Sequence, residues 1–150
     1  PIYVYAVETA IQMTLTELNE NLREIYLEAY TQKEASEYIF RETAKEIQQI
    51  FGAYQGSRRP IFTRWSSDRR ASCARIWCDE ALTLERKIQL FLTMSLRAYR
   101  VPEEEIEKTL AYIAGRDIRA VSERVMHILF QTLAMRYEFS LSDLTQPGLE

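Results

Sequence analysis

The sequence predicts an all-α protein of six or seven helices that ends in a helical hairpin. Three observations support this prediction. Only four glycines and four prolines interrupt 150 residues, so long helices can form along almost the whole chain. Apolar residues recur at helical spacing in most segments, and no segment has a convincing strand pattern. The last apolar stretch, from Asp117 to Phe139, is apolar on more than one side, which is typical of a helix with two packing partners.

The C-terminal hairpin is predicted from two consecutive segments with a very short connection. The first, Glu103 to Gly115, follows Pro102 and places three glutamates at the positive end of the helix dipole. The second is the helix that begins near Asp117. We expect the two to pack antiparallel and a two-fold axis to double them into a dimeric four-helix bundle. The predicted dimer interface comprises apolar residues of both helices: Ile106, Leu110, Ile113, Val121, Val125, Leu129 and Leu133. The alternative is a central helix covered entirely by its own domain.

The other helices are predicted from apolar spacing and capping signals. They cover residues 3–19, 22–30, 31–54, about 67–81 and 84–100. Asn21 with Glu24, and Thr31 with Glu34, have the spacing of capping boxes, and Thr83 is expected to cap the helix that ends at Arg100. Residues 56–67 are loop-like. We expect one domain at 1–139, followed by a partly disordered tail at 140–150.

Composition places the chain among soluble, single-domain proteins, with 47% hydrophobic and 27% charged residues. No apolar run approaches the roughly 20 residues of a membrane span, and we expect no signal peptide. We therefore expect a cytoplasmic protein with no membrane partner. Cys73 and Cys78 are the only cysteines, and with a single histidine they cannot form a structural zinc site, so we expect reduced thiols.

The sequence offers no residues that nominate an enzyme. His127 is the only histidine, and Glu123 one turn before it makes an ordinary i,i+4 pair. A di-iron bundle requires two Glu-x-x-His motifs, which this chain cannot supply. There is also no glycine-rich phosphate loop and no nucleophile elbow. We expect no catalytic residues, no metal and no cofactor.

Positive charge is concentrated between residues 57 and 76. This segment contains one acidic residue, Asp68, and six arginines: Arg58, Arg59, Arg64, Arg69, Arg70 and Arg75. It could contact nucleic acid, an acidic partner or an anionic small molecule, or it could be a solvated loop whose arginines balance the acidic first half of the chain. Nucleic acid is the least favoured, because a net charge of −3 leaves no broad basic face for phosphates.

Large aromatic residues lie in and beside the same basic segment. Arginine and tryptophan together bind flat or anionic organic molecules through stacking and forked hydrogen bonds. Aromatic residues from two earlier helices could line the same cavity. The predicted ligand site comprises Tyr26, Tyr30, Phe51, Tyr54, Phe62, Trp65, Arg75 and Trp77. The alternative is that these aromatic side chains are core residues that need no ligand.

Several stretches of the chain resemble the C-terminal domain of TetR-family transcriptional regulators. They are Tyr26 to Tyr30 (YLEAY), Ile50 to Gly52 (IFG), Ser95 to Ile106 (SLRAYRVPEEEI) and the closing helix. In that family the all-helical C-terminal domain binds an inducer and dimerises through its last two long helices, while an N-terminal helix-turn-helix binds operator DNA. The resemblance implies a homodimer that binds an unidentified small-molecule effector.

The helix-turn-helix of the family has no counterpart in this sequence. The chain starts at Pro1 in residues that are already apolar and helical in character, so we expect the natural protein to extend upstream. The resemblance implies that operator DNA is bound only through that further domain, with the effector changing the spacing of its recognition helices. The alternative is a stand-alone helical-bundle adaptor or small-molecule-binding protein without DNA binding.

Overall fold

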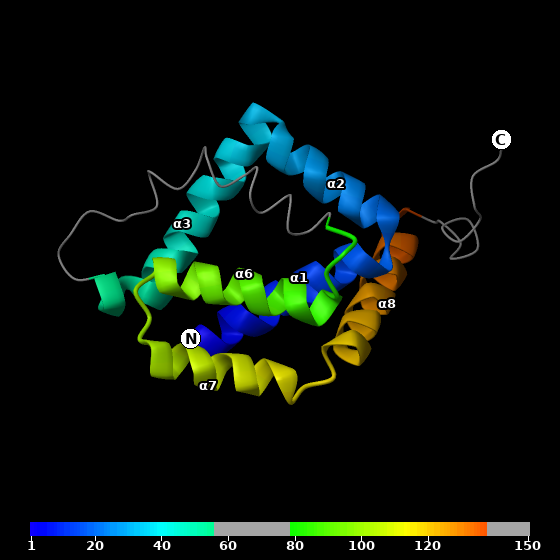
Figure 1. The fold of residues 1–150 in the computed structure, drawn as a ribbon. Helices are drawn as coiled ribbons and strands as arrows, with labels where there is room; N and C mark the ends of the chain where they lie inside the picture. The colour runs from blue at the N-terminus through cyan, green and yellow to red at the C-terminus, as the bar shows by residue number, and fades with distance from the viewer. Residues whose placement is uncertain (56–78, 138–150) are drawn as a thin grey trace.

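The computed structural model describes residues 1–55 and 79–137, and within these ranges it contains helices and turns but no strand (Figure 1). Its helices are α1 (Ile2–Leu18), α2 (Glu20–Thr31), α3 (Lys33–Gln55), α6 (Leu84–Ala98), α7 (Glu103–Ala114) and α8 (Ile118–Tyr137). The predicted all-α class is confirmed, and the six helices of the described residues agree with the predicted six or seven. The loop at 56–67, most of the predicted helix at 67–81 and the tail at 140–150 lie outside the described residues. Residues 79–81, predicted as the end of that helix, form a turn instead.

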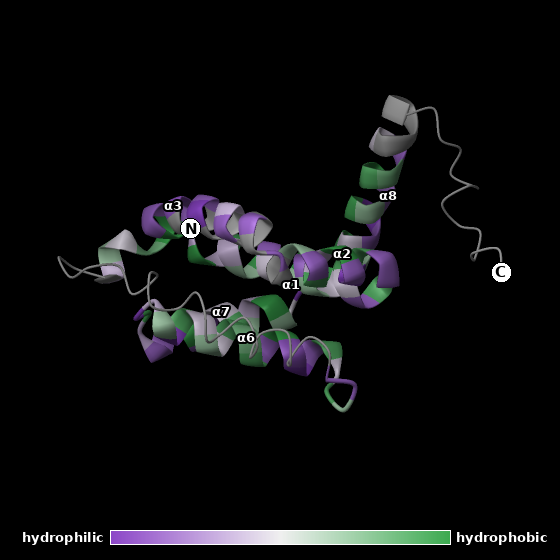
Figure 2. Ribbon diagram, turned by 90° about the horizontal axis from the view of Figure 1, so that it is seen from above, coloured by the Kyte–Doolittle hydropathy of each residue, from purple (hydrophilic) through white to green (hydrophobic). Residues whose placement is uncertain are grey.

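The helices form two layers with one helix rising beyond them. Helices α1, α2 and α3 make up the first layer, and α6 and α7 make up the second (Figure 2). Helix α1 packs against each of the other five described helices. Helix α8 packs on α1 and then extends away from both layers (Figures 1 and 2). The first helix is therefore the centre of the described fold.

The junction between α1 and α2 is made by a single asparagine. The backbone N–H of Asn19 donates to the Leu15 carbonyl at 3.1 Å and so ends α1. Its side-chain oxygen accepts the Leu22 N–H at 3.0 Å and so starts α2. The predicted cap, Asn21, was wrong by two residues, because the extended conformation that a cap requires is adopted at Asn19.

The next two capping predictions have opposite outcomes. Thr31 is the last residue of α2, and α3 starts only after Gln32, so the prediction of Thr31 as a helix cap was wrong. The short break falls at Gln32, whose backbone is extended and whose N–H still bonds to α2. In contrast, Thr83 caps α6 as predicted, because its side-chain oxygen accepts the Arg86 N–H at 3.3 Å.

The connection between α6 and α7 contains the one non-glycine residue with positive φ in the described part of the chain. Arg100 has φ 62°, and the N–H of the next residue, Val101, donates to the Leu96 carbonyl at 3.0 Å. This is the geometry of a Schellman helix end. It stops α6 at Ala98, two residues before the predicted end, and directs the chain into α7.

Two clusters of buried side chains hold the layers together. The first core comprises Ile2, Ile47, Phe51, Leu96, Tyr99, Val101 and Ile106. The second core comprises Ala6, Ala10, Met13, Ile88, Leu92, Ile113 and Ile118. Ala6 and Ala10 are fully buried, and their small side chains let neighbouring helices approach α1 closely. Tyr5 and Leu110 contact both cores, so the two form one continuous apolar interior.

The predicted antiparallel hairpin of the last two helices is not formed. Helices α7 and α8 are joined by a short turn at residues 115–117, but α8 diverges from α7 and has its most extensive packing on α1 (Figures 1 and 2). The reason is that Ile118 and Ser122, one turn apart in α8, are buried, and Ile118 lies in the second core with residues of α1. The apolar row of α8 thus starts inside the chain's own core.

Candidate functional site

Phe51 of the predicted ligand site lies in the first core and has no exposed surface. Its ring stacks on Tyr99 with centroids 4.4 Å apart and meets the edge of Tyr5 at 5.2 Å. These contacts join α3 to α6 and α1. Because the ring is fully buried and makes both of these contacts, Phe51 stabilises the fold.

Tyr54, one turn further along α3, is half-buried beside Phe51. Its hydroxyl donates to Glu105 Oε2 at 2.7 Å, which joins the end of α3 to the start of α7. This hydrogen bond to a carboxylate, together with burial, raises the pKa of Tyr54 above its usual value. The tyrosine therefore remains a neutral hydrogen-bond donor over the physiological pH range.

The rest of the predicted ligand site is not gathered around these two residues. Tyr26 is half-buried on α2, outside the first core, and burial raises its pKa. The side chain of Tyr30 and the whole of Phe62, Trp65, Arg75 and Trp77 lie outside the described residues, as does the arginine-rich segment at 57–76. The aromatic site as a complete set stays a prediction.

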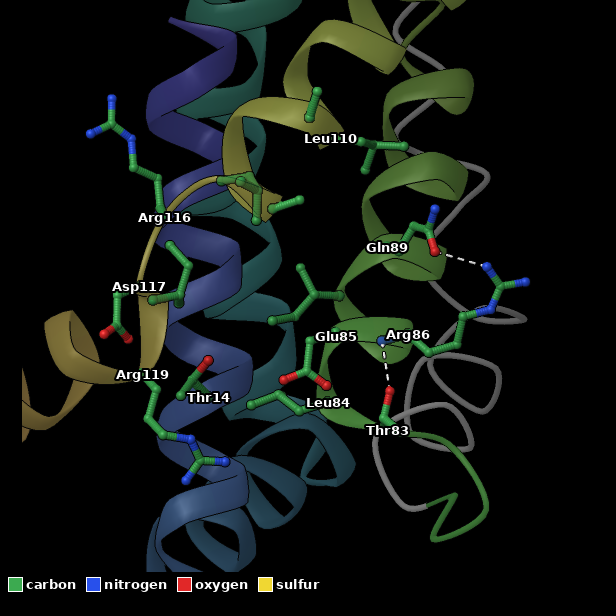
Figure 3. A pocket seen from close by; sticks show the side chains of 15 residues that line it. Thr14, Thr83, Leu84, Glu85, Arg86, Gln89, Leu110, Arg116, Asp117 and Arg119 are labelled. Carbon is green, nitrogen blue, oxygen red and sulfur yellow. Dashed lines mark hydrogen bonds between the residues drawn. The ribbon is translucent and has the colours of Figure 1, made fainter.

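A different cavity lies within the described part of the chain, between α6, α7 and the first turn of α8 (Figure 3). This groove has a volume of about 670 Å³, which is within the range of small-molecule sites. Its floor is apolar and consists of Leu84, Ile88, Leu110, Ile113 and Ile118. Thr14 of α1 also lines it. The groove thus borders the second core and touches four helices.

Charged side chains surround this apolar floor. Arg86 donates to Gln89 Oε1 at 2.8 Å, and the Arg116 guanidinium lies 4.5 Å from the centre of the Tyr112 ring. Asp117 accepts the Ala120 N–H at 3.0 Å and so starts α8. Two further charged groups, Glu85 and Arg119, line the groove on its α6 and α8 sides. The groove therefore combines apolar surface with charges of both signs.

Sequence reasoning did not identify this groove. None of its lining residues belongs to the predicted ligand site, and Leu110 and Ile113 were assigned to the dimer interface. The lining comes from four helices whose arrangement depends on the divergence of α8 from α7. The sequence places Arg116 in the turn between two apolar helices and Arg119 just after it, but this local pattern does not indicate a cavity.

The predicted dimer-interface residues occupy two different environments. Ile106 and Ile113 of α7 are 1% and 7% exposed and belong to the chain's own cores, and Leu110 is half-buried between them. On α8, Val121 and Val125 are half-buried, whereas Leu129 is 46% exposed and its neighbour Ile128 59% exposed. The side chain of Leu133 lies outside the described residues. The exposed apolar surface of the predicted interface is therefore on α8.

His127 lies beside this exposed surface and bonds within α8. Its Nε2 atom is 2.9 Å from Gln131 Nε2, one turn later, so the predicted pairing with Glu123 is replaced by one with Gln131. In residues 1–55 and 79–137 no three histidine, cysteine or acidic side chains converge in a way that could hold a metal ion. Among the six described helices, none combines the length and apolar character that a membrane crossing needs.

Comparisons of this chain with models of protein families, with curated proteins and with solved structures gave no match.

Proposed function

We propose that this chain is the effector-binding and dimerisation domain of a TetR-like transcriptional regulator, acting in the cytoplasm as a homodimer. It couples small-molecule binding to the operator affinity of a helix-turn-helix domain outside this chain. One observation carries the proposal: α8 contributes Ile118 and Arg119 to the groove and, three turns later, exposes Ile128 and Leu129. A single helix thus connects a ligand-sized cavity to an apolar surface.

The exposed part of α8 supports dimerisation. Two large aliphatic side chains are adjacent on a helix that extends beyond both layers (Figure 2). Fully burying one such side chain contributes about 2 kcal/mol to the free energy of association. In a two-fold symmetric dimer each residue is buried once in each protomer. The half-buried Val121 and Val125 lie on the same helix and extend the apolar surface. A second copy of the chain is the partner that the family resemblance implies.

The position of the groove supports a coupling mechanism. A ligand there contacts α6, α7, the start of α8 and Thr14 of α1. Because α8 packs on α1 more extensively than on any other described helix, a ligand that prefers one packing of α8 on α1 shifts the population toward that arrangement. In a dimer held together by α8, this shift changes the distance between the N-terminal ends of the two protomers. Such a change is the output that an operator-binding dimer requires.

Sedimentation velocity of three forms of the chain tests the dimer. We expect the unmodified protein to be a dimer at about 100 μM and Leu129→Arg to be a monomer with unchanged helical circular dichroism, since an arginine cannot be buried there without a partner. Ile25→Arg is the matched control, because Ile25 is 59% exposed but lies on α2. It should remain a dimer. A monomeric unmodified protein, or a dimeric Leu129→Arg, would overturn the proposal.

A further inference from the structure

Two charged groups of the groove have no partner in the described part of the chain. Glu85 is in the first turn of α6, and Arg119 is in the first turn of α8. Both line the groove, yet they form no ion pair with each other and no hydrogen bond with another described side chain. Each is exposed to solvent, so it is hydrated until something occupies the groove.

The other charged groups around the groove are already engaged. Arg86 is directed toward Gln89 and away from the groove floor, and Arg116 extends away from α6 toward the ring of Tyr112 (Figure 3). The carboxylate of Asp117 is used by the first turn of α8. What remains for a ligand is one carboxylate and one guanidinium, with apolar surface between α6 and α8.

Figure 3 shows these two groups on different sides of the groove. Glu85 lies beside Leu84 on the α6 side, and Arg119 comes from the α8 side, with its guanidinium below Thr14 in this view. Thr14 and Leu84 lie between them, and the aliphatic side chains of the second core form the rest of the groove floor (Figure 3). A ligand that fills the groove removes water from both charged groups, so each needs a compensating partner.

We propose that the groove binds a zwitterionic molecule with an apolar body, of the kind represented by a short peptide of aliphatic residues with free ends. Its ammonium pairs with Glu85, its carboxylate accepts forked hydrogen bonds from Arg119, and its side chains cover the floor. This inference rests on the proposed function, of which it names the effector class. A ligand with a single charge leaves either Glu85 or Arg119 without a partner.

Three probes with the same apolar body test the charge requirement. Leucyl-leucine carries both charges, N-acetyl-leucyl-leucine carries only the carboxylate, and leucyl-leucinamide carries only the ammonium. In isothermal titration calorimetry of the intact chain, we expect leucyl-leucine to bind at least about tenfold more tightly than either blocked form. Equal affinities for the three, or no heat from any of them up to about 10 mM, would overturn the inference.

Two substitutions assign the charges to their partners. Glu85→Gln should remove the advantage of leucyl-leucine over the acetylated form and preserve its advantage over the amide. Arg119→Gln should do the reverse. Arg124→Gln, an exposed arginine of α8 outside the groove, is the control and should leave all three affinities unchanged. An unchanged order of affinities in Glu85→Gln and Arg119→Gln would place the ligand elsewhere and overturn the inference.

The same samples separate this inference from the proposed function. Sedimentation velocity reports whether the chain is a dimer whatever it binds. A dimer that discriminates none of the three probes contradicts the zwitterionic ligand and leaves the dimerisation domain supported. A monomer that binds leucyl-leucine selectively supports the zwitterionic ligand and contradicts the assignment as a dimerisation domain.

Discussion

Helices α1 and α8 are both rich in apolar residues, but they use them differently. Along α1, buried positions continue from Ile2 to Thr16, and the helix packs against the five other described helices. Along α8, Ile118 and Ser122 are buried, whereas Ile128 and Leu129, in the third turn, are largely exposed. An apolar row in a sequence therefore predicts that a helix face needs covering. It does not say whether the same chain covers it.

Side-chain size explains part of this difference. Ala6 and Ala10 have only a methyl group as side chain, so several helices can approach α1 at once. The later turns of α8 present larger aliphatic side chains beyond both layers of the fold (Figure 2). Two predictions test this contrast between a helix buried by its own chain and one left open to a partner, and a third concerns an exposed ion pair outside both helices.

The largest effect is expected in the second core. Leu92 of α6 is fully buried among residues of α1, so Leu92→Ala should lower the free energy of unfolding by about 3 kcal/mol through lost apolar burial and a residual cavity. Leu129→Ala should change it by less than about 0.5 kcal/mol under conditions where the chain is monomeric. Urea denaturation followed by circular dichroism at low protein concentration measures both. Equal losses of unfolding free energy would contradict the contrast between the core around α1 and the exposed turns of α8.

A smaller effect of opposite sign is expected where α8 enters the core. The Ser122 hydroxyl is fully buried and has no hydrogen-bond partner in the described part of the chain. Since an unsatisfied buried hydroxyl is unfavourable, Ser122→Ala should raise the free energy of unfolding by about 1 kcal/mol. The same denaturation experiment measures this gain. A loss of stability would show that the hydroxyl contributes to the packing of α8 on α1.

The smallest effect concerns an exposed contact at the α6–α7 connection. Arg97 donates two hydrogen bonds to Glu103, at 2.6 and 2.9 Å, and this lowers the pKa of the Glu103 carboxyl. Because the pKa is lower in the folded state, the stabilisation is present above the unfolded-state value of about 4.3 and is lost as the pH falls through the folded-state value. The difference in unfolding free energy between the unmodified protein and Glu103→Gln should therefore be positive at about pH 6 and decrease as the pH falls below about 4.

A difference that is constant over this pH range would mean that the glutamine substitution acts through something other than the ion pair. Arg97→Gln is the matching variant and should produce the same pH dependence, since both substitutions remove one side of the same contact.

The sequence predicted the helices well because their apolar spacing and capping residues are local features. Thr83 is an example, since its role depends on residues within one helical turn. The cap at Asn19 was missed because two asparagines precede the same apolar row, and Asn21 also had a glutamate at capping-box spacing. Which asparagine becomes extended depends on where α1 ends, and this is set by packing.

The path of α8 and the groove could not be predicted for a different reason. A short connection such as residues 115–117 permits either an antiparallel return or a divergence of the next helix. The choice depends on the burial of Ile118 in the second core, to which α1 residues distant in sequence, such as Ala10, also belong. The groove exists only because α8 diverges, so no local pattern could indicate Glu85 and Arg119 as facing side chains.

Amide hydrogen exchange at two protein concentrations directly tests the claim that the later turns of α8 are covered by a second copy. We expect exchange in residues 125–132 to slow markedly as the concentration rises from about 1 to about 100 μM, while exchange in α1 stays the same, because only α8 gains burial on association. Exchange in α8 that does not depend on concentration, with α1 equally unaffected, would contradict the claim.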